Sequence, residues 1–116
     1  MPTKRKRLAR LNWDTASEPT RAGACAAFLP ASLRRVSYRA IDLSFAFALV
    51  EQLNKNGWHV TIDMHKDGHR CVSAERFVSE MELFGESSYM ASLAEVVCVV
   101  FLRCSGVEVL FEGELG

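Results

Sequence analysis

The chain lacks any apolar stretch long enough to cross a membrane. Its longest unbroken apolar run, Val96–Leu102, has seven residues, whereas a helix that spans a bilayer needs about 20. The run Ala24–Leu29 follows a basic segment, but it is shorter than a signal-peptide core, which needs roughly 7–15 apolar residues. We therefore predict a cytoplasmic protein that does not act at a membrane.

Sequence motifs of common enzymes are missing as well. The seven glycines form neither a GxSxG nor a GxGxxG motif, so we find no nucleophile elbow and no loop that would hold a phosphate. Cys71 stands near His69 and His59, but closeness in sequence is not the geometry of a Cys–His catalytic pair. We predict no catalytic residues, no cofactor and a protein that is not an enzyme.

The four cysteines do not follow the spacing of a disulfide-rich domain. Cys25, Cys71, Cys98 and Cys104 include no CxxC pair. Because the sequence carries no secretion signal, we interpret them as reduced thiols in small buried or half-buried side chains.

Charge is abundant but unevenly distributed along the chain. Residues 1–40 carry nine basic and two acidic side chains, while residues 41–116 carry five basic and twelve acidic ones. Runs of like charge repel one another, so we predict a basic, flexible N-terminal arm over residues 1–36 and a single domain over residues 37–116.

The arm offers a nucleic-acid-binding alternative, since clustered cations neutralise phosphates and an aromatic ring can stack on a base. The residues concerned are Lys4, Arg5, Lys6, Arg7, Arg10 and Trp13. The simpler interpretation is a solvated arm whose Trp13 docks on the domain.

Periodicity in the domain predicts a helix followed by a hairpin. The helix covers about Ala40–Asn54, where apolar side chains recur with helical spacing and Asp42 lies in the first turn. A strand from Trp58 to His65 then alternates apolar and polar residues and leads through Lys66, Asp67 and Gly68 into a return strand at about His69–Ala74. A three-residue turn there pairs His65 with His69 and Ile62 with Val72.

A third strand is predicted over Arg76–Phe84, with Phe77 or Val78, Met81 and Leu83 as its apolar positions. The whole pattern indicates an α+β fold in which two helices pack on a three- to four-stranded antiparallel sheet.

Two readings compete for residues 93–104. Ser92 and Glu95 have the capping-box spacing of a helix that ends before Gly106, while the valine-rich run also suits a buried strand paired with residues 107–112. We favour the helix. Residues 107–116 resemble a picornaviral protease recognition site, apart from Glu112, and also suit a last edge strand with Val107, Val109 and Phe111 inward. We favour the strand.

Three short segments give a family resemblance over about residues 41–104. They are IDLSFAFALVEQL from Ile41, Gly57-Trp58 before the hairpin turn at Asp67-Gly68, and ASLAEVVC from Ala91. In these the chain resembles the phage ABA sandwich domain, a family of small phage and prophage proteins. The resemblance implies a helix–strands–helix fold and a phage origin, and it implies no shared catalytic residues. The basic arm and the valine-rich last helix depart from the family.

Alternating carboxylates suggest an acidic strand face that binds a partner. Glu75, Glu80, Glu82 and Glu86 fall within twelve residues, and Asp63 comes from the neighbouring strand. Such a face attracts the arginine- and lysine-lined surfaces with which host proteins hold nucleic acid. Our first hypothesis is a phage-encoded, anti-CRISPR-like inhibitor of a host defence complex, acting in the cytoplasm of the infected bacterium. The competing interpretation is a solvated face that only keeps the protein soluble.

The hairpin carries the sharpest chemical pattern in the chain. With a three-residue turn, one face of the hairpin would hold His59, Asp63, His65, His69 and Cys71. These are proper zinc ligands, so a small metalloprotein is a third hypothesis. The spacing matches no established zinc motif, and we predict a metal-free polar face.

Overall fold

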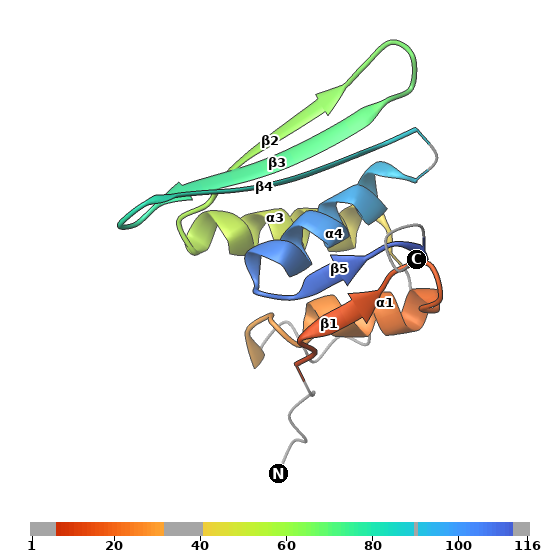
Figure 1. The fold of residues 1–116 in the computed structure, drawn as a ribbon, viewed down its shortest axis with the longest axis horizontal. Coiled ribbons are helices and arrows are strands. Elements are labelled where there is room, and N and C mark those ends of the chain that lie inside the picture. The colour runs from red at the N-terminus through yellow and green to blue at the C-terminus, as the bar shows by residue number, and fades with distance from the viewer. Residues whose placement is uncertain (1–6, 32–40, 90, 113–116) are drawn as a thin grey trace.

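The computed structural model describes residues 7–31, 41–89 and 91–112, and it has an α+β fold (Figure 1). Its sheets are a three-stranded antiparallel sheet in the order β2-β3-β4 and a parallel pair, β1 with β5. In chain order the elements are β1 (Arg10–Asn12), α1 (Glu18–Ala26), α3 (Leu43–Lys55), β2 (His59–Met64), β3 (Arg70–Phe77), β4 (Met81–Ser88), α4 (Leu93–Cys104) and β5 (Glu108–Leu110).

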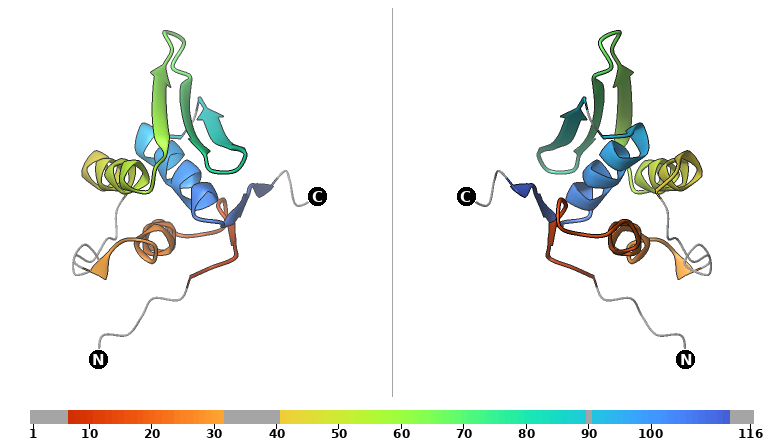
Figure 2. Two further views of the ribbon diagram at one scale, coloured as in Figure 1. Left: turned by 90° about the vertical axis from the view of Figure 1, so that its left-hand side faces the viewer. Right: turned by 90° about the vertical axis from the view of Figure 1, so that its right-hand side faces the viewer.

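The molecule is built in layers around α4. One face of the three-stranded sheet lies against α3 and α4, while α1, β1 and β5 pack on the other side of α4 (Figures 1 and 2). Helix α4 is therefore surrounded, and the eight residues Ala94 and Val96–Leu102 are all buried. No helix in the described ranges is long and apolar enough to cross a membrane.

Both predicted helices are confirmed, with side-chain caps at their first turns. Asp42 is the N-cap of α3 and accepts a hydrogen bond from the Phe45 amide at 2.9 Å. Ser92 and Glu95 form the predicted capping box of α4, which settles the choice between helix and strand in favour of the helix. The β-branched valines are tolerated because burial on every side outweighs their weak helix propensity.

The predicted hairpin register is also confirmed. Ile62 pairs with Val72, and the His65 amide donates to the His69 carbonyl oxygen at 2.9 Å across the three-residue turn. Gly68 has a φ of 91°, a left-handed conformation that glycine adopts without strain.

The third strand lies four to five residues later than predicted. Strand β3 continues to Phe77, residues 78–80 form the turn, and β4 runs Met81–Ser88 instead of starting at Arg76. A run of alternating residues gives the period of a strand but not the position of its turn, and no glycine marks this one.

The N-terminal boundary at residue 36 is wrong for the described part of the arm. Leu11, Trp13 and the inner side of α1 belong to the same hydrophobic core as α3 and α4. Strand β1 pairs in parallel with β5, so the two ends of the described chain meet in one small sheet. Residues 1–6 and 32–36 of the predicted arm lie outside the described residues.

Candidate functional site

The register of the sheet separates two faces of different character. On the inner face, Val72 and Ala74 of β3 are buried against the helices. On the opposite face, which we call the outer face, no described helix or strand covers the side chains (Figure 2). By register the outer face carries His59, Thr61, Asp63, Cys71, Ser73, Glu75, Phe77, Met81, Leu83, Gly85 and Ser87.

The predicted acidic face is divided between the two sides of the sheet. Glu82 and Glu86 lie on the inner side, where Glu82 pairs with Arg76 at 2.7 Å and Glu86 pairs with Arg103 at 2.8 Å. Glu75 lies on the outer face opposite Leu83, and Glu80 lies in the turn. The prediction of one continuous face was wrong because odd-numbered side chains lie on the outer face and even-numbered ones on the inner face in both β3 and β4, which separates Glu75 from Glu82 and Glu86.

Asp63 does lie on the outer face, opposite Cys71. Asp63, Glu75 and Glu80 form no ion pair within residues 7–31, 41–89 and 91–112, in contrast to Glu82 and Glu86. The outer face and the turn next to it therefore carry carboxylates whose negative charge no described basic side chain neutralises.

Four large apolar side chains gather where β3 turns into β4. Phe77, Val78, Met81 and Leu83 are 69%, 65%, 60% and 65% exposed, and we call this group the apolar end. The sequence marked these positions as apolar but gave no sign that the sheet would leave them exposed. If Val72 and Ala74 are assigned to the buried face, the alternation of the strands places the odd-numbered Phe77, Met81 and Leu83 on the exposed face. This assignment would have predicted their exposure.

A shallow hollow of about 450 Å³ lies along the middle of the sheet. Small polar residues line much of it, among them Thr61, Ser73 and Ser87, and Gly85 adds no side chain. The outer face thus changes along its length from the apolar end, through this hollow, to the hairpin tip.

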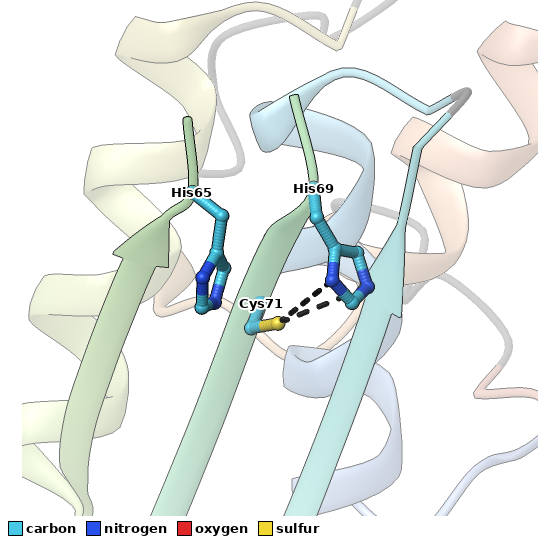
Figure 3. A group of neighbouring side chains, drawn as sticks. All are labelled: His65, His69 and Cys71. Atoms are coloured by element: carbon cyan, nitrogen blue, oxygen red, sulfur yellow. Dashed lines mark hydrogen bonds between the residues drawn. The ribbon is translucent and has the colours of Figure 1, made fainter. Parts of the chain in front are cut away.

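At the hairpin tip, His65, His69 and Cys71 come together (Figure 3). Each offers a ligand atom, and these atoms all lie within 4.8 Å of one another. His59 and Asp63, the other two members of the predicted set, share the outer face but stand outside this group.

Neighbouring residues hold the tip in place. The Tyr89 ring stacks on His69 with 4.3 Å between ring centroids. The Asp67 carboxylate accepts hydrogen bonds from the His69 amide at 2.9 Å and from the Tyr89 hydroxyl at 3.3 Å. The His69 amide is the main reason that the pKa of Asp67 lies below its ordinary value.

Three of the six residues proposed for nucleic-acid binding lie in the described ranges, and each of the three contacts another side chain of the protein. Trp13 is only 4% exposed and lies under the Arg21 guanidinium, 4.5 Å from the ring centroid, so it is not free to stack on a base. Arg10 pairs with Glu108 at 3.0 Å, and Arg7 lies 5.2 Å from the Phe28 ring centroid. Lys4, Arg5 and Lys6 lie outside the described residues.

Comparison with protein-family models, curated proteins and solved structures gives no match for this chain.

Proposed function

We propose that this chain is a non-enzymatic protein that binds another protein through the outer face of its sheet. The observation that carries the proposal is the apolar end, where Phe77, Val78, Met81 and Leu83 are each more than half exposed. Soluble domains seldom leave such a group uncovered at one place, and patches of this kind mark interaction sites. Aromatic and methionine side chains are also enriched at the centres of protein interfaces.

The charge of the outer face favours a basic partner. Asp63 and Glu75 stand on this face without an ion pair to any described residue, and Glu80 adjoins it in the turn. Lysine and arginine side chains around an apolar centre would complement this arrangement and speed association at low salt. The expected interface is therefore an apolar contact with an acidic rim.

The most concrete form of the proposal is a phage-encoded inhibitor of a host defence complex. Its partner would be a host protein that holds nucleic acid with arginine and lysine, such as a CRISPR effector subunit or another defence nuclease. The resemblance of residues 41–104 to small phage proteins and the acidic outer face support this form. Such an inhibitor would act in the cytoplasm of the infected bacterium.

A pull-down from nuclease-treated bacterial lysate tests the proposal. Phe77→Ala is compared with Phe47→Ala, since Phe47 is a 58% exposed phenylalanine that belongs to α3 and not to the outer face. We expect the original protein and the Phe47→Ala variant to retain the same stoichiometric partner. Phe77→Ala should weaken its affinity about tenfold or more, the loss typical of a truncated interface anchor.

Charge reversal provides the second arm of the experiment. Glu75→Lys should slow association with the partner and reduce the salt dependence of the association rate. Glu51→Lys, which changes an exposed glutamate of α3, should do neither. Equal behaviour of Phe77→Ala and Phe47→Ala would reject the outer face as the binding surface. Loss of every captured protein after nuclease treatment would instead favour binding of nucleic acid.

A further inference from the structure

We propose that the tip of the β2–β3 hairpin binds one Zn²⁺ ion through His65, His69 and Cys71. The inference does not rest on the proposed partner, because it concerns a different end of the outer face and a different chemistry. Two imidazoles and a thiolate are ligands that suit a borderline-soft divalent ion such as Zn²⁺.

The hairpin brings the three ligands together by its own geometry. The three-residue turn places His65 opposite His69, with the His65 amide hydrogen-bonded to the His69 carbonyl oxygen. Cys71 lies two residues beyond His69, so the alternation of the strand returns it to the same face. Figure 3 shows both rings on one side of the hairpin with the Cys71 sulfur between them.

The distances are close to those that a zinc ion requires. The Cys71 sulfur lies 4.0 Å from each ring nitrogen of His69, and the centroids of the two imidazole rings are 5.5 Å apart. Zinc bonds of about 2.0–2.3 Å place tetrahedral ligand atoms roughly 3.5 Å apart. The ligand atoms here would need to approach by about an ångström or less, through rotation of the exposed His65 side chain and a smaller rotation of the Cys71 thiol toward His69.

The surroundings suit a metal better than an ordinary polar surface would. Stacking on Tyr89 fixes the plane of the His69 ring, and the orientation of ligand rings by neighbours is a regular feature of metal sites. The carboxylates of Asp67 and Asp63, in the turn and opposite Cys71, add negative charge near the position of the ion. Three protein ligands leave a fourth coordination position open for water.

Cys71 is also distinct among the four thiols. Cys25 and Cys98 are buried in the core, and Cys104 is half-buried at the end of α4. Cys71 alone among them lies beside histidines on the outer face. Two of the three histidines of the chain share this position with it.

Cobalt binding provides a direct test, because Co²⁺ takes zinc sites and reports a bound thiolate by a near-ultraviolet charge-transfer band. Protein without a polyhistidine tag is stripped with EDTA, titrated with Co²⁺ and then titrated with Zn²⁺. We expect saturation at one ion per chain, a thiolate band, and displacement of cobalt by zinc. Cys71→Ser should abolish the band, and His69→Ala should weaken binding about a hundredfold or more.

The matched controls are Cys104→Ser and His59→Ala, which change the same residue types outside the group of ligands. Both should bind cobalt as the original protein does, and circular dichroism should show all four variants folded. Cobalt binding without a thiolate band, or a band that survives Cys71→Ser, would overturn the site. So would an equal loss of affinity in His59→Ala and His69→Ala.

Discussion

At the scale of single residues, the environment of each thiol decides its chemistry. Desolvation by the surrounding protein raises the pKa of Cys104 to about 12, with Arg76 acting in the opposite direction and Glu82 in the same one. Burial also raises the pKa of Cys25 well above its ordinary value. The sequence predicted buried or half-buried thiols and placed Cys71 beside histidines on the hairpin, but it could not predict the raised pKa of Cys25 or Cys104, because that depends on how completely the fold buries each thiol.

The raised pKa of Cys104 predicts a loss of stability in alkali. An unfolded chain loses this thiol proton near the ordinary pKa of 9.0, while the folded chain keeps it until about pH 12. Above pH 9 the unfolded state therefore binds fewer protons, and the free energy of unfolding falls as the pH rises. Urea unfolding should show the original protein losing stability more steeply than Cys104→Ala between pH 9 and 12. Parallel curves for the two proteins would contradict the assignment.

At the scale of elements, local signals in the sequence located the helices more accurately than the strands. The capping box of Ser92 and Glu95 was read directly from residue types, and Asp42 was placed in the first turn of the helix that it caps. The turn at Gly68 fixed the register of the first hairpin. The turn at residues 78–80 has no comparable marker, so the position of β4 was missed. The division of the glutamates was missed because odd-numbered Glu75 and the even-numbered glutamates were assigned to one face. The group at His65, His69 and Cys71 followed from the hairpin register, whereas the apolar end required the faces of all three strands.

The capping box of α4 gives a prediction at this scale. The Ser92 side chain accepts a hydrogen bond from the Glu95 amide at 3.2 Å, and the Glu95 carboxylate accepts one from the Ser92 amide at 3.2 Å. Ser92→Ala should lower the free energy of unfolding by about 1 kcal/mol, measured by urea denaturation. Ser44→Ala, an exposed serine inside the first turn of α3, serves as the control and should change it little. A cost no larger than that of the control would show that the cap does not stabilise α4.

At the scale of the whole molecule, the basic N-terminal third and the acidic remainder of the sequence do not form separate parts of the structure. Arg10 and Arg21 belong to the basic half of the sequence, yet they pair with Glu108 and Glu95 of the acidic half. Apolar residues between the basic ones decide the outcome, because Leu11 and Trp13 lose most of their contact with water in the fold. Counting charges could not predict that this segment joins the core, because the count ignores the apolar residues that lie between the basic ones.

Trp13 therefore acts as a core residue that ties the N-terminal segment to the rest of the fold. Its ring lies under Arg21, its carbonyl oxygen accepts a hydrogen bond from the Arg21 Nε at 2.9 Å, and its amide donates to the Leu110 carbonyl oxygen at 2.8 Å. Trp13→Ala should lower the free energy of unfolding by about 3–5 kcal/mol, the usual cost of removing a large buried aromatic.

Urea unfolding measures this loss, with the exposed Phe47→Ala as control, which should change stability by about 0.5 kcal/mol or less. Equal stability of the Trp13→Ala variant and the original protein would mean that the segment carrying β1 is not part of the core. A large loss would also change how truncations are interpreted. Deleting residues 1–12 removes β1, the partner of β5, so any loss of binding in such a variant reflects damage to the fold as well as loss of cations.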